Sequence, residues 1–267
     1  MNRPWVRTAT VLSAFAAVFI TLTVTGYTQK SATWDEPQHL ITGYAMLAHR
    51  DYRIDPEHPP LLRMWAALPL MFDGTVKLDS TIIDQLDPGY WVGMGQFKYA
   101  HHSLYKQNDA DRLLYRARFM VVLLGVGLGV LLFSWARELF GFWTAVVVLT
   151  LYCLEPNLLA HASLVTTDFG ATCFMFGTLY FLWRFSRQRS VANAAGSNLF
   201  FTLAMVSKFT VIMLAPVIVV LLMVDSYRQP NRLRSLGISA GILASMLATS
   251  SMYPFRYHLR AIRFPLT

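Results

Sequence analysis

The sequence predicts an all-α polytopic membrane protein with about 6–7 transmembrane helices and a long external loop that contains interfacial helices. Three observations predict this class. Apolar residues make up 55% of the 267 residues and charged residues only 14%, whereas soluble domains contain about 45–50% and about 25%. Several uncharged segments are long enough to cross a bilayer. Basic residues fall mainly in alternate connections between these segments.

The first predicted span covers residues 9–26, which carry no charge and would form a helix about 27 Å long. Arg3 and Arg7 precede it, so a cleaved signal peptide is the alternative. The run is long for a signal peptide and further apolar segments follow, which favours a retained helix. Further spans are predicted at residues 118–136, 142–160, 164–183, 197–224 and 236–254, with 197–224 expected to break near Ser207 and Lys208.

The basic residues orient these spans. Cytoplasmic connections are rich in Lys and Arg, and the short connection 155–163 contains neither. We therefore expect an integral inner-membrane or plasma-membrane protein with a cytoplasmic N-terminus. The residues assigned to the cytoplasmic side are Arg3, Arg7, Arg137, Arg184, Arg187, Arg189, Arg228, Arg232 and Arg234.

Residues 27–115 form the first external loop. After Pro37 the apolar residues follow helical spacing, and Pro59-Pro60 suits the start of a second short helix over residues 61–71. The first pattern is amphipathic, and the second is apolar almost all round but too short to span. We expect both helices to lie in the membrane interface.

Composition excludes several classes of protein. The net charge of +8 would suit nucleic acid or anionic lipid, but no Lys/Arg cluster alternates with stacking aromatics, so we expect no nucleic-acid partner. Cys153 and Cys173 form neither a disulfide framework nor a metal-binding spacing. Phosphate-loop, zinc and serine-hydrolase signatures are lacking.

The adjacent carboxylates of Asp35 and Glu36 directly follow the first span. Two like charges side by side repel unless a cation, a hydrogen-bond donor or a substrate compensates them. Either residue would also suit the start of a helix whose first turn contains Pro37. From spacing alone, a functional role and a capping role weigh about equally.

Three further polar residues are candidates for chemistry. His58 precedes a rigid Pro-Pro pair where it could donate to phosphate, although an ordinary turn explains it as well. Asp168 follows two threonines at the outer start of a span, where a carboxylate is either functional or a helix cap. Lys208 stands alone between apolar stretches, where it either extends to the membrane surface or faces a phosphate.

Taken in order, these motifs resemble the GT-C class of integral membrane glycosyltransferases, specifically the protein O-mannosyltransferase and aminoarabinose transferase-like superfamily. That pattern has an Asp-Glu pair after the first span, a His/Lys-Pro-Pro-Leu, an Arg before the second span, a small-polar-Asp element and a later Lys. Here these are Asp35-Glu36, His58-Pro59-Pro60-Leu61, Arg118, Thr166-Thr167-Asp168 and Lys208. The resemblance covers about residues 9–225.

The resemblance implies transfer of a sugar from a polyprenyl-phosphate donor to a lipid, glycan or protein acceptor on the external face of the membrane. Asp35 would be the catalytic base, supported by Glu36. The donor phosphate would meet His58, Arg118 and Lys208, and Asp168 would shape the sugar or acceptor pocket. A divalent metal ion is a candidate cofactor, with Asp35 and Asp168 as its candidate ligands.

We expect residues 1–267 to form a single GT-C-like transmembrane domain. The chain is shorter than typical family members, so we expect a truncated member without a C-terminal external domain. The alternative function is a non-catalytic subunit that binds the lipid carrier or assists assembly. A small transporter ranks last, because neither inverted repeats nor charges at mid-bilayer depth are visible.

Overall fold

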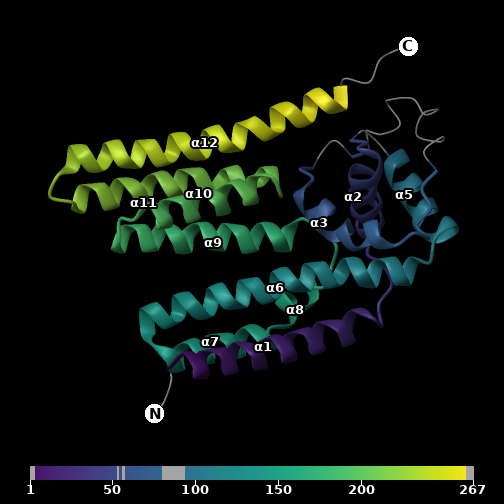
Figure 1. The fold of residues 1–267 in the computed structure, drawn as a ribbon, viewed down its shortest axis with the longest axis horizontal. Coiled ribbons are helices and arrows are strands. Elements are labelled where there is room, and N and C mark those ends of the chain that lie inside the picture. Colours follow the sequence, from purple (N-terminus) through teal and green to yellow (C-terminus); the bar gives the residue numbers. More distant parts are fainter. Residues whose placement is uncertain (1–3, 53, 56–57, 80–93, 263–267) are drawn as a thin grey trace. The chain divides into compact units, whose positions relative to one another are not determined.

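The computed structural model describes residues 4–52, 54–55, 58–79 and 94–262, with side chains described through residue 249. Within these ranges every regular element is a helix, which confirms the predicted all-α class (Figure 1). The chain divides into two compact units. Unit 1 comprises Met1–Asp55 and Leu62–Phe169, and unit 2 comprises Pro56–Leu61 and Gly170–Thr267.

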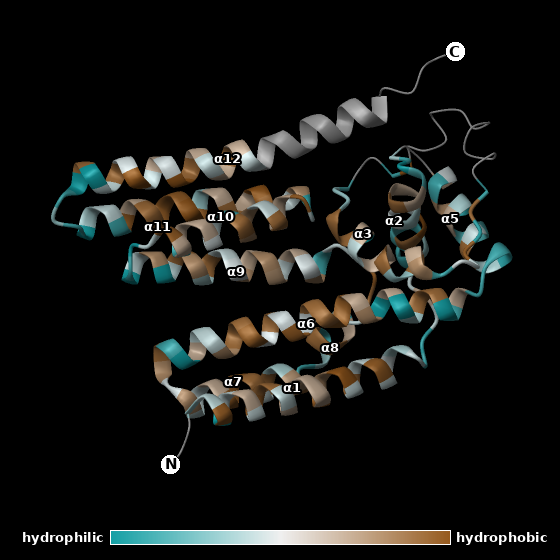
Figure 2. Cartoon of the chain, viewed as in Figure 1, coloured by the Kyte–Doolittle hydropathy of each residue, from teal (hydrophilic) through white to brown (hydrophobic). Residues whose placement is uncertain are grey.

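Long apolar helices form one part of unit 1. Helix α1 (Pro4–Tyr27) packs against α6 (Ala110–Phe140), α7 (Phe142–Leu154) and the short α8 (Pro156–His161). Figure 2 shows hydrophobic residues along much of α1 and α6. Helix α7 ends at Leu154 because Glu155 adopts an extended backbone and its carboxylate accepts the Leu158 N–H of α8. The predicted span 142–160 is therefore two helices rather than one.

Glycines allow α1 and α6 to approach closely. A Cβ atom on Gly125 would lie 2.6 Å from Phe19 Cε1, and one on Gly129 would lie 2.1 Å from Phe15 Cζ. Tyr152 of α7 completes the contact, because its hydroxyl donates to the Gly125 carbonyl at 2.9 Å. Small residues commonly permit such packing between membrane helices.

The segment between α1 and α6 contains α2 (Glu36–His49), α3 (Leu61–Ala67), the 3₁₀ helix η1 (Leu68–Phe72) and α5 (Met94–Gln107). The α2 stripe packs into a hydrophobic core, and protein covers nearly every residue of its first two turns. An amphipathic stripe predicts a lipid-facing helix and a protein-facing helix equally well. The apolar stripe of α2 therefore faces protein, and the placement of this helix at the membrane interface stays a prediction. The buried residues of this core are Leu40, Ile41, Ala45, Ile54, Ala66, Ala67, Leu70, Tyr99, Ala100, Leu104, Leu113, Leu114, Ala117 and Val165.

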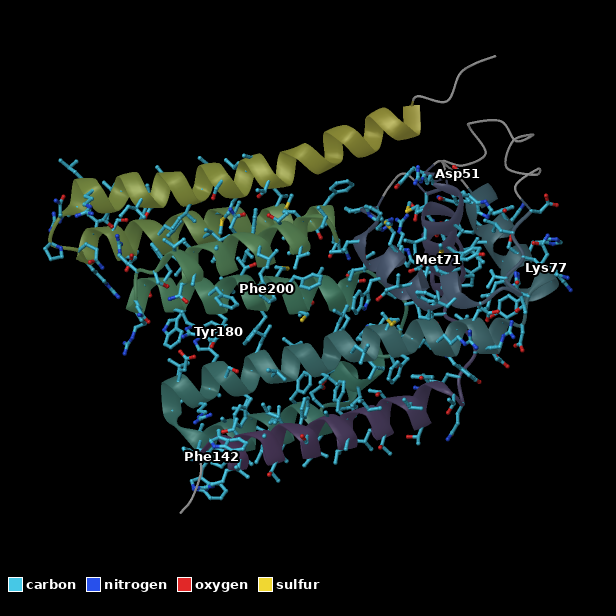
Figure 3. All side chains as sticks on the ribbon, viewed as in Figure 1. Asp51, Met71, Lys77, Phe142, Tyr180 and Phe200 are labelled. Carbon is cyan, nitrogen blue, oxygen red and sulfur yellow. The ribbon has the colours of Figure 1, made fainter. Side chains whose placement is uncertain are left out.

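Unit 2 consists mainly of α9 (Asp168–Arg187, in this unit from Gly170), α10 (Val191–Met205), η3 (Phe209–Leu214), α11 (Ala215–Arg228) and α12 (Arg232–Ile262). Its core combines apolar packing with hydrogen bonds between helices, such as Asn198 to Ser245 at 2.8 Å. Phe200 lies so close to Gly177 that a Cβ there would be 2.1 Å from its ring (Figure 3). Helix α10 ends before Ser207 and Lys208, which confirms the predicted break.

Three helical segments in the described chain are long and apolar enough to cross a membrane by length and composition. They are Pro4–Tyr27, Ala110–Phe140 and Phe209–Arg228, the last of which joins η3 and α11. The larger count of about 6–7 spans, estimated from apolar segment length, stays a prediction.

The close approach at Gly125 generates a prediction with a matched control two residues away. Gly125→Ala should lower the free energy of unfolding by about 1–3 kcal/mol, because the new methyl group overlaps the buried Phe19 ring. Gly127→Ala should be neutral or stabilising by up to about 1 kcal/mol, since nothing lies within 4 Å of its Cβ position. Thermal unfolding of both variants in a neutral detergent checks this. Equal melting temperatures for the two variants would contradict the packing argument.

Candidate active site

A buried ion pair lies at the start of α2. Arg118 Nε donates to Glu36 Oε1 at 2.8 Å, and Arg118 Nη2 donates to Glu36 Oε2 at 2.7 Å. Both side chains are completely shielded from solvent. This is the bidentate geometry in which a guanidinium and a carboxylate interact most strongly.

The remaining Arg118 donors bind the end of α1 and the segment that follows it. Nη1 donates to the carbonyls of Tyr27 at 3.0 Å and Lys30 at 2.9 Å, and Nη2 donates to the Ser31 carbonyl at 2.9 Å. An arginine has five N–H groups, and all five are thus used within the protein. Arg118 was expected to meet the donor phosphate, but here it has no N–H left for one. Its observed role is to anchor Glu36.

Glu36 is held by backbone donors as well. Thr33 N–H donates to Oε2 at 2.8 Å, and Val165 N–H donates to Oε1 at 3.0 Å. Burial raises the pKa of the Glu36 carboxyl, but the hydrogen bonds and charge of Arg118 and the N–H groups of Val165 and Thr33 outweigh burial and lower the pKa below its usual value. Glu36 therefore stays ionised inside the protein.

Asp35 has the opposite environment. It occupies the N-cap position of α2, its side chain is exposed, and that side chain makes no capping hydrogen bond. The capping interpretation of Asp35 is therefore not realised by its carboxylate. Instead, the carboxylate of Glu36, the first helical residue, accepts the N–H of Thr33, three residues earlier. The two adjacent carboxylates thus differ: Glu36 holds the backbone in place, and Asp35 faces solvent.

Asp168 is connected to the same ion pair through the backbone. It is exposed and is the first residue of α9, three residues after the Val165 N–H that binds Glu36. Asp35 is the direct neighbour of Glu36. Both exposed carboxylates are therefore carried by backbone that the Glu36–Arg118 pair restrains within unit 1.

The two other predicted cations belong to unit 2. His58 and Lys208 are both half-buried, and each makes polar or electrostatic interactions within the protein. The Leu61 N–H donates to the Val206 carbonyl at 3.2 Å, which attaches the Pro-Pro segment to the break between α10 and η3. Unit 1 thus holds Asp35, Glu36, Arg118 and Asp168, and unit 2 holds His58 and Lys208.

A second buried ion pair was not predicted from the sequence. Arg63 Nη2 lies 2.6 Å from Asp55 Oδ2, and neither side chain is exposed. Arg63 Nη1 also donates to the Asp55 carbonyl at 3.0 Å, and the Asp55 backbone is left-handed with φ 54°. A lone arginine inside the apolar run Leu61–Ala67 was the available signal, because a charge buried there needs a partner.

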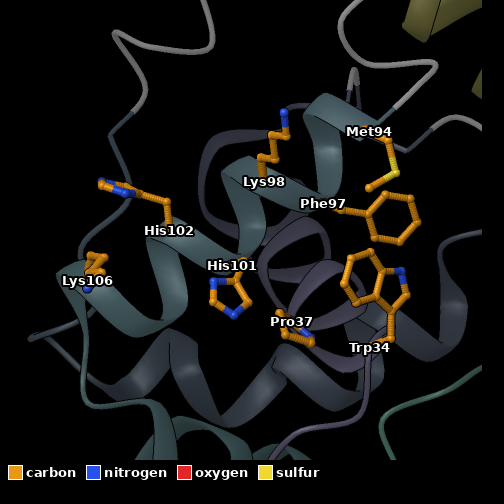
Figure 4. Close-up of a pocket in the computed structure, with 8 residues that line it drawn as sticks. All are labelled: Trp34, Pro37, Met94, Phe97, Lys98, His101, His102 and Lys106. Atoms are coloured by element: carbon orange, nitrogen blue, oxygen red, sulfur yellow. The ribbon is translucent and has the colours of Figure 1, made fainter.

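An open pocket of about 350 Å³ lies next to the Asp35 segment. It is formed by two residues that flank the carboxylate pair, Trp34 and Pro37, and by one side of α5 (Figure 4). The α5 residues that line it are Met94, Phe97, Lys98, His101, His102 and Lys106. No local sequence pattern indicates this pocket, because its two walls are about 60 residues apart in the chain.

The described residues do not form a dedicated metal centre. No group of three or more His, Cys, Asp or Glu side chains is placed to hold a metal ion within the part of the chain that the structure describes. Asp35 and Asp168, the candidate ligands, belong to no such group.

The environment of Arg118 predicts that alanine substitutions at two arginines, only two residues apart, change the free energy of unfolding by very different amounts. Arg118→Ala should lower the free energy of unfolding by about 3–5 kcal/mol, because it leaves the Glu36 carboxylate buried without its counter-charge. Arg116→Ala should cost about 0–1 kcal/mol, since Arg116 is half-exposed and pairs with Asp73 near the surface. Chemical denaturation in detergent measures both. Comparable losses would show that the Glu36–Arg118 pair is not the anchor.

The lowered pKa of Glu36 predicts an acid-sensitive contribution to stability. This contribution is complete above the unfolded pKa of about 4.3 and disappears as pH falls through the lower folded pKa. Unfolding midpoints measured from about pH 6 to pH 3 should therefore fall less steeply in Glu36→Gln than in the wild type. Asp111→Asn, at an exposed position, should keep the wild-type slope. Parallel curves for wild type and Glu36→Gln would refute the assignment.

A comparison with known proteins identifies the family of the chain. A family model described as dolichyl-phosphate-mannose-protein mannosyltransferase matches residues 112–254, more than half of the chain. The matched range includes Arg118, Asp168 and Lys208. No curated protein and no solved structure matches the chain at a significant level. The chain is an integral membrane protein that belongs to the dolichyl-phosphate-mannose-protein mannosyltransferase family, whose members are glycosyltransferases of the GT-C type.

Proposed function

We propose that the protein transfers a sugar from a polyprenyl-phosphate carrier to an acceptor on the external face of the membrane, with Asp35 as the general base. One observation carries this proposal. The Asp35 carboxylate is exposed and makes no capping hydrogen bond, although it adjoins Glu36, whose buried side chain is held by Arg118 and two backbone N–H groups. A base needs this combination of an accessible carboxylate and a fixed backbone.

The proposed reaction is a displacement at the anomeric carbon of the sugar. An acceptor hydroxyl attacks this carbon, a new carbon–oxygen bond forms, and the bond between the anomeric carbon and the phosphate oxygen breaks. The electron pair of the broken bond leaves with the polyprenyl phosphate. The proton of the acceptor hydroxyl moves to the Asp35 carboxylate and later to solvent, so that atoms and charges balance.

The leaving phosphate requires cationic or hydrogen-bond-donating groups. We assign this role to His58 and Lys208, because Arg118 uses all its donors elsewhere. A lysine offers a compact positive charge for phosphate, and a histidine offers a ring N–H. The backbone hydrogen bond from Leu61 to Val206 supports the assignment, since it attaches the short segment after His58 to the residues just before Lys208.

The exposed position of Asp168 suits contact with sugar hydroxyl groups. A carboxylate accepts hydrogen bonds from such hydroxyls, and its backbone is fixed close to Val165. Glu36 acts as a positioning residue. Its contacts with Arg118, Thr33 and Val165 restrain the backbone on which Asp35 is carried.

The general-base role predicts the effect of removing one charge. Asp35→Asn should lower the rate of sugar transfer by about 10²–10⁴-fold, because the amide cannot accept the proton. Asp111→Asn is the matched control, as it removes an exposed carboxylate from the first turn of α6 and should leave the rate unchanged. The assay follows release of polyprenyl phosphate from polyprenyl-phosphate mannose in proteoliposomes, at equal amounts of folded protein.

Two results would decide against the proposal. Equal rates for wild type and Asp35→Asn would exclude the base assignment. Retention of the polyprenyl-phosphate donor by a wild-type protein that never turns it over would favour the non-catalytic lipid-carrier-binding subunit instead.

A further inference from the structure

The pocket beside Trp34 has an unusual distribution of charge. Four of the eight described residues that line it are basic, namely Lys98, His101, His102 and Lys106, and none of the eight is acidic. The surrounding loop is rich in acids, with eleven Asp or Glu residues between positions 30 and 112. The basic lining is therefore not a consequence of local composition.

These basic side chains also repeat along α5. Lys98, His102 and Lys106 follow one another at intervals of four residues, which places them on one face of the helix. Lys98 and Lys106 bring two positive charges to this face, and the His102 ring between them offers an N–H. None of the described residues that line the pocket is acidic. A bound anion would offset the two lysine charges.

The other half of the pocket is apolar and well exposed. Trp34 and Phe97 stack with their ring centroids 5.6 Å apart, yet Trp34 remains 66% exposed and Met94 55% exposed. Figure 4 shows Trp34, Phe97 and Met94 gathered at one end of the pocket, with His102 and Lys106 at the other end. The ligand that fits this arrangement has an anionic group at one end and an apolar body at the other.

We propose that this pocket binds the phosphorylated headgroup of an anionic membrane lipid. The phosphate contacts the basic residues of α5, and the first apolar groups of the lipid lie against Trp34, Phe97 and Met94. The volume of about 350 Å³ accommodates a headgroup, while the acyl chains extend beyond it. A free phosphate would leave the apolar half unused. Binding of the lipid does not depend on sugar transfer.

Occupancy of the pocket affects the segment that carries Asp35. Trp34 directly precedes Asp35, and Pro37 follows two residues after it. Contacts between a lipid and both residues add a second restraint to this segment, besides the one that Glu36 provides through Arg118. Anionic lipids at a membrane surface attract each nearby lysine by about 1 kcal/mol, which applies to Lys98 and Lys106 of the pocket.

Short-range quenching of Trp34 fluorescence tests the proposal. The full chain in neutral detergent is titrated with phosphatidic acid that carries bromine atoms on its acyl chains, since bromine quenches a nearby indole. The chain contains seven tryptophans, so Trp34→Phe defines the share of the signal that comes from Trp34. We expect saturable quenching in the wild type and loss of that saturable part in Trp34→Phe.

Charge variants then test the phosphate contact. Lys98→Gln/Lys106→Gln should weaken binding of brominated phosphatidic acid by on the order of tenfold or more. Lys30→Gln/Lys77→Gln removes the same charge at exposed lysines outside the pocket lining and should bind as the wild type does. Circular dichroism and melting temperature confirm that each variant is folded before the comparison is made.

Three outcomes would overturn the proposal. Equal quenching of the wild type and Lys98→Gln/Lys106→Gln would exclude these two lysines as the residues that bind the phosphate. Equal quenching by brominated phosphatidylcholine would show apolar binding without recognition of an anionic headgroup. Displacement of the lipid by inorganic phosphate at the same concentration would identify a site for a free anion instead. Lipid quenching is measured without a sugar donor. A protein that shows no sugar transfer can therefore still pass or fail this lipid-binding test.

Discussion

The bidentate pair between Glu36 and Arg118 is the constraint on which the candidate site depends. It connects the end of α1, the start of α2, helix α6 and the segment before α9. Removing two charges from water costs several kcal/mol per ion, and attraction alone recovers this only when the geometry is good and every other donor is satisfied. Here the donors of Arg118 and both oxygens of Glu36 are used. The pair therefore specifies one backbone arrangement.

That arrangement explains how two adjacent carboxylates can have different environments. The backbone of α2 begins between them, with Glu36 directed to the protein interior and Asp35 exposed. The positive charge of Arg118 offsets the charge of Glu36, so that the repulsion expected of neighbouring carboxylates is reduced. The cation that the sequence pattern required is thus supplied by the protein, and it compensates Glu36 rather than a substrate.

The two units use different means to hold apolar helices together. In unit 1, Gly125 and Gly129 let α6 approach the rings of Phe19 and Phe15. In unit 2, hydrogen bonds join α10 to α12 and α11 to α12, as between Asn198 and Ser245 and between Ser226 and Ser239 at 2.9 Å. Both solutions suit helices in lipid, where apolar surface alone does not drive association and close packing or polar contacts must do so.

The sequence by itself determined the features that depend on local composition. Apolar content predicted the all-α membrane class, and the polar Ser207-Lys208 interruption predicted the break after α10. Only the tertiary structure decided the role of Arg118, the burial of α2, the Asp55–Arg63 pair and the pocket beside Trp34. Arg118 and Glu36 are 82 residues apart, and no local pattern specifies which donor a distant carboxylate will meet. Likewise, an amphipathic stripe requires an apolar partner but does not state whether that partner is lipid or protein.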